Sequence, residues 1–198
     1  MQNTNLITVK DNKTAFIPYL VAGHTSNEVF SAALKFLDEV GADLIEIGIP
    51  FTDPIAEGRI IESAHHHALN NDFVLDDICN IVKEFRTISD TPVIAMGYTN
   101  SFINPSSEHI ATKLSDSGFN GVLIVDLPAS EKSIINKFKE KKLNLVQLIA
   151  PTTQLNLIED FLENDPSLIY YITQRGITGS NNLNLDEISD KLILIKKL

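Results

Sequence analysis

The sequence ADLIEIGIPFTDPIAEG, residues 42–58, holds the clearest structural signal in the chain. Residues 44–47 are apolar except for Glu46, which predicts a buried strand that carries one carboxylate and ends at Gly48. Burial raises the pKa of a carboxyl group and suits it to proton transfer near neutral pH. Glu57, in the loop that follows, offers a second acid over the strand end. Two carboxylates in unlike environments are typical of an acid/base site, whereas the competing interpretation is an ion-paired strand residue beside a solvated turn.

Length and composition predict one domain over residues 1–198. The chain has 43% hydrophobic residues, enough for a sizeable core, and a net charge of -10 with its lysines and arginines spread out, which argues against binding nucleic acid. No apolar run approaches the roughly 18 residues of a membrane span, so we expect a soluble, cytoplasmic protein. Cys79 is the only cysteine, which excludes an internal disulfide, and its place in a helical pattern favours a core role.

Apolar runs and helical periodicities alternate along the whole chain. The runs predict strands at residues 15–22, 44–48, 92–97, 121–125, 143–149 and 168–172. The periodicities predict helices that start at Thr25 or Ser26, cover about 60–69 and 74–85, open at Pro105 and at Ser130, cover 155–162, and start near Leu185. Such alternation predicts an α/β fold with parallel strands and right-handed crossovers.

Two architectures fit this alternation: a doubly wound sheet and a TIM (β/α)8-type barrel. The chain has no Gly-x-Gly-x-x-Gly after its first strand, which weakens the dinucleotide-binding interpretation. Polar residues gather just after strand ends, at Glu46, at Asp126 and in the loop after Ile172. That is the face where barrel enzymes place their chemistry, so the barrel is favoured, with about six βα units in this chain.

Residues 46–58, EIGIPFTDPIAEG, resemble the signature of the tryptophan synthase alpha subunit family. Further matches follow in the family's order: FIPYLVAG at 16–23, GYTN at 97–100, VDLP at 125–128 and RGITG at 175–179. The resemblance implies a lyase of tryptophan biosynthesis that splits indole-3-glycerol phosphate by retro-aldol cleavage into indole and glyceraldehyde 3-phosphate.

The resemblance also implies roles for particular residues. The family's carboxylate at the indole ring carbon falls on Glu46, and the one that assists at the indole nitrogen falls on Glu57. Thr178 and Gly179 match the mobile loop, with Thr178 near the second carboxylate and the Gly179 N–H near the phosphate. The residues implied for the hydrophobic indole slot are Tyr19, Met96, Leu123, Ile149 and Tyr170.

The implied partner is a beta subunit that carries PLP and receives the indole, in a heterotetramer of two alpha and two beta subunits. Asp53 and Pro54 lie on the segment that touches the beta subunit in the family. No cofactor is implied for this chain, and no metal is expected. The three consecutive histidines His65, His66 and His67 point about 100° apart on a helix and so cannot ligate one ion from one face.

The sequence departs from the family pattern in two ways. The second acid is Glu57 where the family ordinarily has Asp, and Arg59 beside it replaces a common Pro and is placed to pair with Glu57. The sequence ends at Leu198, in the sixth helix, whereas the family continues through a seventh and eighth βα unit that bind most of the phosphate. We therefore expect a fragment of a longer protein, a barrel closed by a partner, or a decayed relative.

These departures leave alternatives to the lyase open. One is a catalytically weak or inactive alpha-like subunit that binds and modulates the beta subunit. Another is a different barrel lyase that acts on a phosphorylated sugar.

Overall fold

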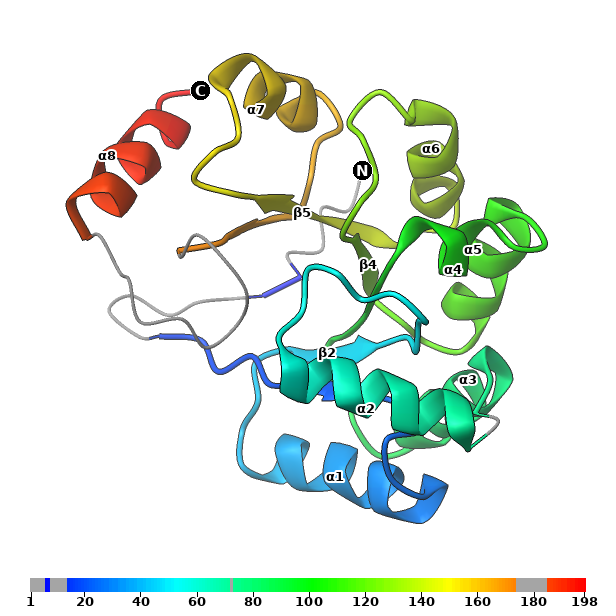
Figure 1. The fold of residues 1–198 in the computed structure, drawn as a ribbon. Helices are drawn as coiled ribbons and strands as arrows, with labels where there is room; N and C mark the ends of the chain where they lie inside the picture. The colour runs from blue at the N-terminus through cyan, green and yellow to red at the C-terminus, as the bar shows by residue number, and fades with distance from the viewer. Residues whose placement is uncertain (1–5, 8–13, 72, 174–184) are drawn as a thin grey trace.

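A computed structural model describes residues 6–7, 14–71, 73–173 and 185–198 (Figure 1). The strands are β1 (Tyr19–Val21), β2 (Ile45–Gly48), β3 (Val93–Gly97), β4 (Gly121–Ile124), β5 (Asn144–Ile149) and β6 (Leu168–Tyr171). The helices are α1 (Asn27–Glu39), α2 (Arg59–Asn70), α3 (Leu75–Phe85), α4 (Thr99–Ile103), α5 (Ser107–Asp116), α6 (Lys132–Glu140), α7 (Leu155–Leu162) and α8 (Leu185–Ile195). No helix of the described residues is both long and apolar enough to cross a membrane.

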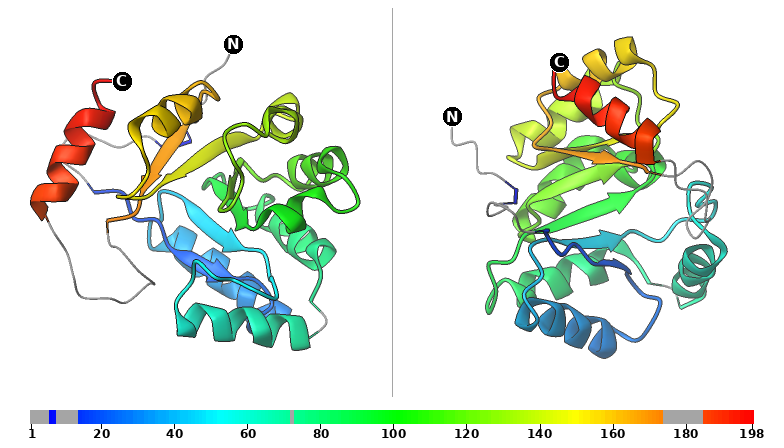
Figure 2. Two further views of the ribbon diagram at one scale, coloured as in Figure 1. Left: turned by 45° about the horizontal axis from the view of Figure 1, so that its top comes forward. Right: turned by 90° about the vertical axis from the view of Figure 1, so that its left-hand side faces the viewer.

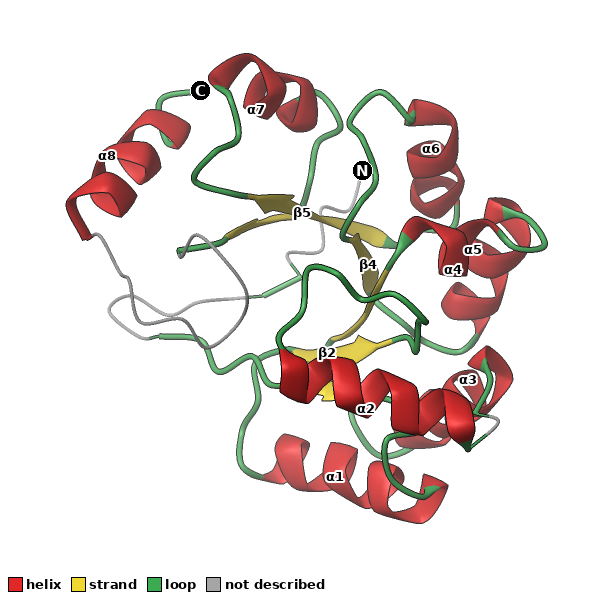
Figure 3. Ribbon diagram, in the orientation of Figure 1, coloured by secondary structure: helices red, strands yellow, loops and turns green. Residues whose placement is uncertain are grey.

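The six strands form one parallel sheet whose spatial order, β1 to β6, is the order of the chain. A doubly wound sheet reverses its strand order at a switch point, and the described strands contain no such reversal. The helices lie around the outside of the curved sheet, as the colours by secondary structure make plain (Figure 3). This arrangement confirms the expected α/β barrel-type fold with about six βα units.

Side chains that alternate along the strands build two apolar layers. In β2, Ile45 and Ile47 point outward into a cluster shared with Phe30 and Leu34 of α1. Leu44, just before β2, belongs to a second cluster inside the curve of the sheet, which includes Ile94, Leu123 and Val146. Successive strand residues point to opposite faces, so Glu46 faces the inside as Leu44 does.

Local signals explain where several helices begin. The Ser26 side chain accepts a hydrogen bond from the Val29 N–H at 3.4 Å and caps α1. The Ser106 hydroxyl accepts one from the His109 N–H at 3.2 Å and caps α5 directly after Pro105. The helical assignment of Cys79 is also confirmed, because this residue is buried in α3.

The last helix packs at the end of the row of helices. Ile195 of α8 contacts a small cluster formed by Ile158 and Phe161 of α7 together with Ile149 of β5. The views of Figure 2 also place α8 beside α7. The strand β6 therefore has its outer face covered by α7 and α8.

Two elements differ from the sequence prediction. The first strand was expected over residues 15–22, but β1 covers only Tyr19–Val21. Pro18 has no N–H to donate, although its carbonyl still accepts from the Glu46 N–H at 2.9 Å. The short helix α4 was not predicted. It starts where the Thr99 N–H and hydroxyl both donate to Oδ1 of Asp126, at 2.6 and 2.8 Å.

Candidate active site

Glu46 is the buried carboxylate that the sequence predicts. Its side chain lies inside the curve of the sheet between the strand neighbours Tyr19 and Ile94, with which it pairs in register, and is only 4% exposed. Burial, with a smaller contribution from the negative charge of Glu57, raises the pKa of Glu46 to about 7. Its Oε1 atom is buried and has no hydrogen-bond partner among the described residues. A carboxyl group with this pKa can both donate and accept a proton near neutral pH.

Glu57 lies on the loop between β2 and α2, where it is half-buried. Burial raises its pKa as well, and its charge acts on Glu46, so the two carboxyl groups share one region of the molecule. The expected pairing with Arg59 is wrong: Arg59 is exposed and forms no ion pair with Glu57 in the described structure. Within the described residues, no ion pair holds the Glu57 carboxylate.

The loop that carries Glu57 is fixed at three points. The Phe51 N–H donates to Nδ1 of His65 at 3.2 Å, and Nε2 of His66 donates to the Thr52 carbonyl at 3.3 Å. Farther along, the Ala56 N–H donates to the Tyr98 hydroxyl at 3.0 Å. Two helical histidines and a tyrosine at the end of β3 thus hold the backbone before and within the loop's turn.

Four of the five predicted slot residues lie on the inner side of the sheet. Met96 and Leu123 belong to the inner cluster. Burial, followed by the charges of the two glutamates, raises the pKa of Tyr170, which is 41% exposed and thus open to a ligand. Burial and the charges of the same two glutamates also raise the pKa of Tyr19, which pairs in register with Glu46. An apolar and phenolic surface therefore surrounds the buried carboxyl group.

The fifth predicted slot residue, Ile149, does not lie on this inner side of the sheet. Its side chain is fully buried in the outer cluster with Ile158 and Phe161 of α7. The residue before it, Leu148, belongs to the inner cluster and pairs in register with Tyr170. Because strand side chains alternate, an assignment displaced by one residue selects the opposite face.

The other predicted site residues are Thr178, Gly179, Asp53 and Pro54. Thr178 and Gly179 lie outside the described residues. Asp53 is exposed and accepts a hydrogen bond from the Thr52 hydroxyl at 2.8 Å, whereas Pro54 is buried in this chain. The next residue, Ile55, is 84% exposed, so this loop presents both charged and apolar groups to its surroundings.

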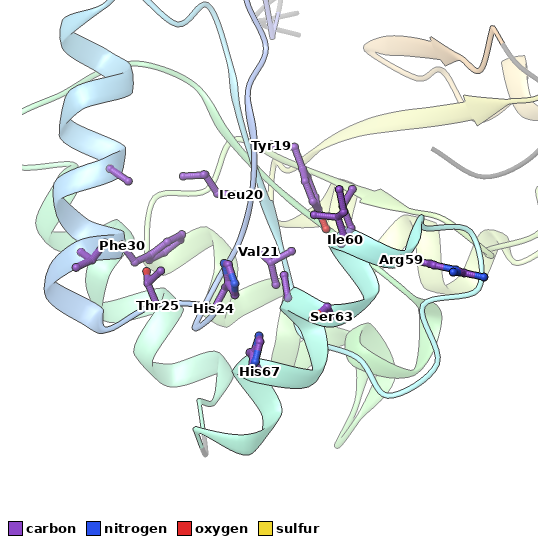
Figure 4. Close-up of a pocket in the computed structure, with 14 residues that line it drawn as sticks. Tyr19, Leu20, Val21, His24, Thr25, Phe30, Arg59, Ile60, Ser63 and His67 are labelled. Carbon is purple, nitrogen blue, oxygen red and sulfur yellow. The ribbon is translucent and has the colours of Figure 1, made fainter. Parts of the chain in front are cut away.

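A groove of about 590 Å³ lies between β1, α1 and α2 (Figure 4). Tyr19, Phe30 and Ile60 line it, and the exposed rings of His24 and His67 meet beside it with centroids 5.7 Å apart. Neither glutamate lines this groove. It is therefore distinct from the inner site, which it touches only through Tyr19.

Two residues that shape the site, His65 and Tyr98, were not predicted from the sequence. His65 is 1% exposed and is the first of three consecutive histidines. The buried positions of α2, Ala64, His65 and Ala68, follow a helical spacing that distinguishes it from the other two. Tyr98 lies in the GYTN match, and its ring stacks on Phe51 with centroids 4.9 Å apart. A buried polar residue on the apolar face of a helix is the signal that identifies His65.

Fold and site together define a barrel-type protein with two neighbouring carboxyl groups of raised pKa, one on β2 and one on the loop that follows it. A family model described as "Tryptophan synthase alpha chain" matches residues 7–198. The chain belongs to the tryptophan synthase alpha chain family, whose members are lyases, and its function is that of the alpha subunit in tryptophan biosynthesis.

Individual relatives agree with this assignment. The tryptophan synthase alpha chain of Marinobacter nauticus is 37% identical over 191 residues, which are 96% of this chain and 71% of the relative. That of Neisseria gonorrhoeae is 34% identical over 189 residues, which are 94% of this chain and 72% of the relative.

Solved structures give the same result. The alpha subunit of Legionella pneumophila superposes with a TM-score of 0.84 at 31% identity, covering 94% of this chain and 70% of that one. A structure of the tryptophan synthase a2b2 complex of Pyrococcus furiosus contains a chain with a TM-score of 0.83 at 34% identity, covering 92% and 74%.

Proposed function

We propose that this chain cleaves indole-3-glycerol phosphate into indole and glyceraldehyde 3-phosphate, with Glu46 as the acid and base at the ring carbon. The observation that carries the proposal is the buried carboxyl group of Glu46, whose pKa of about 7 leaves a large protonated fraction at neutral pH. Family membership supports this choice of substrate, and the inner apolar surface with Met96 and Leu123 suits an indole ring.

The proposed reaction is balanced by proton transfers alone. Protonated Glu46 gives its proton to the ring carbon that bears the glycerol phosphate chain, which leaves a positive charge on the ring. The carboxylate of Glu57 stabilises that charge at the ring nitrogen. The Glu46 carboxylate then takes the proton of the hydroxyl on the attached side-chain carbon. The carbon–carbon bond breaks, its electron pair returns to the ring, an aldehyde forms, and Glu46 is protonated again.

This chemistry defines what else the chain needs. Because the electron pair returns to the ring, the cleavage requires no electron-accepting cofactor, and we propose none for this chain. Thr178 and Gly179 remain predicted contacts to the second carboxylate and the phosphate. We propose the cytoplasm as the site of the reaction, as for amino-acid biosynthesis in general.

We also propose a beta subunit carrying PLP as the partner. A related chain forms an a2b2 complex in Pyrococcus furiosus, which supports this assignment. On this chain the loop with Asp53, Pro54 and Ile55 offers charged and apolar groups for such a contact.

The test is turnover of indole-3-glycerol phosphate by the purified protein, alone and with a beta subunit added. The proposal expects indole and glyceraldehyde 3-phosphate in equal amounts, and a faster rate with the beta subunit. A preparation that forms neither product but still stimulates the beta subunit would contradict the lyase assignment and favour the modulating subunit.

A further inference from the structure

His65 makes two hydrogen bonds from opposite sides of its ring. Nδ1 lies 3.2 Å from the Phe51 nitrogen, and Nε2 lies 3.3 Å from the Tyr19 hydroxyl oxygen. The side chain is 1% exposed, and burial, with a smaller contribution from His66, lowers its pKa to about 4. His65 is therefore neutral at physiological pH and connects the β2–α2 loop to β1.

The neighbours of His65 determine its tautomer. The Phe51 backbone N–H can only donate, so Nδ1 must be the nitrogen with the lone pair. In a neutral imidazole the other nitrogen then carries the proton, so Nε2–H donates to the Tyr19 oxygen. Because that oxygen accepts here, the Tyr19 hydroxyl keeps its own proton for another acceptor.

Gly48 of β2 leaves the space that the Tyr19 hydroxyl occupies. A Cβ atom at Gly48 would lie only 2.3 Å from this oxygen, so glycine is needed to leave room for the phenol. Tyr19 and Glu46 are register partners on adjacent strands and face the same side. The buried Oε1 of Glu46, without a partner among the described residues, is an acceptor on that side.

We propose that His65 is a positioning residue that holds the Tyr19 hydroxyl as a hydrogen-bond donor for Glu46 when Glu46 is a carboxylate. The inference rests on the catalytic role proposed for Glu46. In that reaction Glu46 becomes charged after it protonates the ring carbon, and a buried carboxylate is strongly stabilised by a hydrogen bond to a neutral donor. Tyr19 suits the task, because burial raises its pKa and keeps it protonated.

Other groups also face these residues. Glu57 acts on Glu46 from the β2–α2 loop, and Tyr170 faces both carboxyl groups from β6. Tyr98, at the end of β3, faces Tyr19 and Glu57. His66, the next residue of α2, contributes to lowering the pKa of His65. None of these groups is changed in the variants below, so their effects on the pKa of Glu46 remain constant.

The experiment measures the pKa of Glu46 by carboxyl 13C NMR in the free protein, for which no turnover is needed. Tyr19→Phe removes the donor and keeps the ring, so the pKa of Glu46 is expected to rise by about one pH unit. His65→Asn keeps an acceptor near Phe51 but shortens the reach toward Tyr19, and the same change is expected at a smaller size. His65→Gln, whose amide reaches toward Tyr19, is expected to stay near the wild-type value.

Two comparisons separate positioning from a general loss of structure. Combining His65→Asn with Tyr19→Phe is expected to raise the pKa no further than Tyr19→Phe alone, because both changes remove the same hydrogen bond. His67→Asn, an exposed histidine on the same helix, is expected to change nothing. A wild-type pKa in Tyr19→Phe would overturn the proposal, as would a His65→Asn effect that persists at full size in the Tyr19→Phe background.

This titration is independent of the proposed lyase activity. If the titration behaves as expected but Glu46→Gln turns over normally, the hydrogen bond is real and the catalytic assignment of Glu46 fails. If His65→Asn does not fold, Tyr19→Phe and His65→Gln still decide the outcome.

Discussion

The rings of Tyr98 and Phe51 stack with centroids 4.9 Å and planes 17° apart, and the Tyr98 hydroxyl accepts the Ala56 N–H at 3.0 Å. One side chain at the end of β3 thus holds the β2–α2 loop twice, before its turn and within it. Because Glu57 follows Ala56 directly, the position of the second carboxylate depends on Tyr98.

Tyr98→Phe tests that dependence. The substitution keeps the stacked ring and removes one hydrogen bond of about 1 kcal/mol, so we expect kcat to fall by about fivefold or more with little change in folding. Steady-state kinetics together with the thermal midpoint measure both effects. Unchanged kinetics in a stably folded variant would mean that the stack alone holds the loop.

Glu57→Gln removes the charge of the second carboxylate and keeps its length. We expect kcat to fall by about a hundredfold, as for the loss of one group that stabilises transition-state charge. The pKa of Glu46 should also fall from about 7, because the charge of Glu57 contributes to raising it. A pH titration of Glu46 that does not move would show that the two carboxyl groups act independently.

Glu46 makes the stability of the protein depend on pH. Its pKa is raised in the folded state from 4.5 to about 7, so the folded state binds more protons between these values and stability decreases as the pH rises through them. Glu46→Gln removes the free-energy cost of ionising this buried carboxyl group in the folded state. Urea unfolding should therefore find the variant more stable than wild type at pH 8, by at most about 3 kcal/mol, with the difference disappearing below pH 4.5. A stability difference between Glu46→Gln and wild type that is larger at low pH than at pH 8 would contradict the burial of Glu46.

Leu148 and Ile149 provide a matched pair on opposite faces of β5. Ile149→Val is expected to lower stability by about 1 kcal/mol and to leave KM unchanged, because its side chain packs against α7. Leu148→Val is expected to alter KM for the indole substrate, because Leu148 faces inward beside Tyr170. The reverse pattern in a kinetic and unfolding series would restore Ile149 to the slot.

The strand with Glu46 could be predicted from sequence because a lone carboxylate stands out in an apolar run. The face of Ile149 could not, since each face of the predicted β5 segment carries apolar residues and one amide, Asn144 or Gln147, so the pattern gives no inward or outward preference. Helix α4 was missed because a five-residue helix has no full apolar period.

The role of His65 depends on contacts that no local pattern contains. Its two partners, Phe51 and Tyr19, lie 14 and 46 residues away in the chain. The fold brings α2 against β1 and the β2–α2 loop, so tertiary structure decides which groups the buried His65 contacts.

In the proposed reaction Glu46 moves the protons of carbon–carbon cleavage, and indole formation by Glu46→Gln beside wild type tests this role most directly. Glu62→Gln, at an exposed position of α2, is the matched control. We predict that Glu46→Gln folds with the wild-type circular dichroism spectrum and loses at least about a thousandfold in kcat, while the control stays near wild type. Indole formation at the wild-type rate by folded Glu46→Gln would exclude Glu46 as the acid and base at the ring carbon.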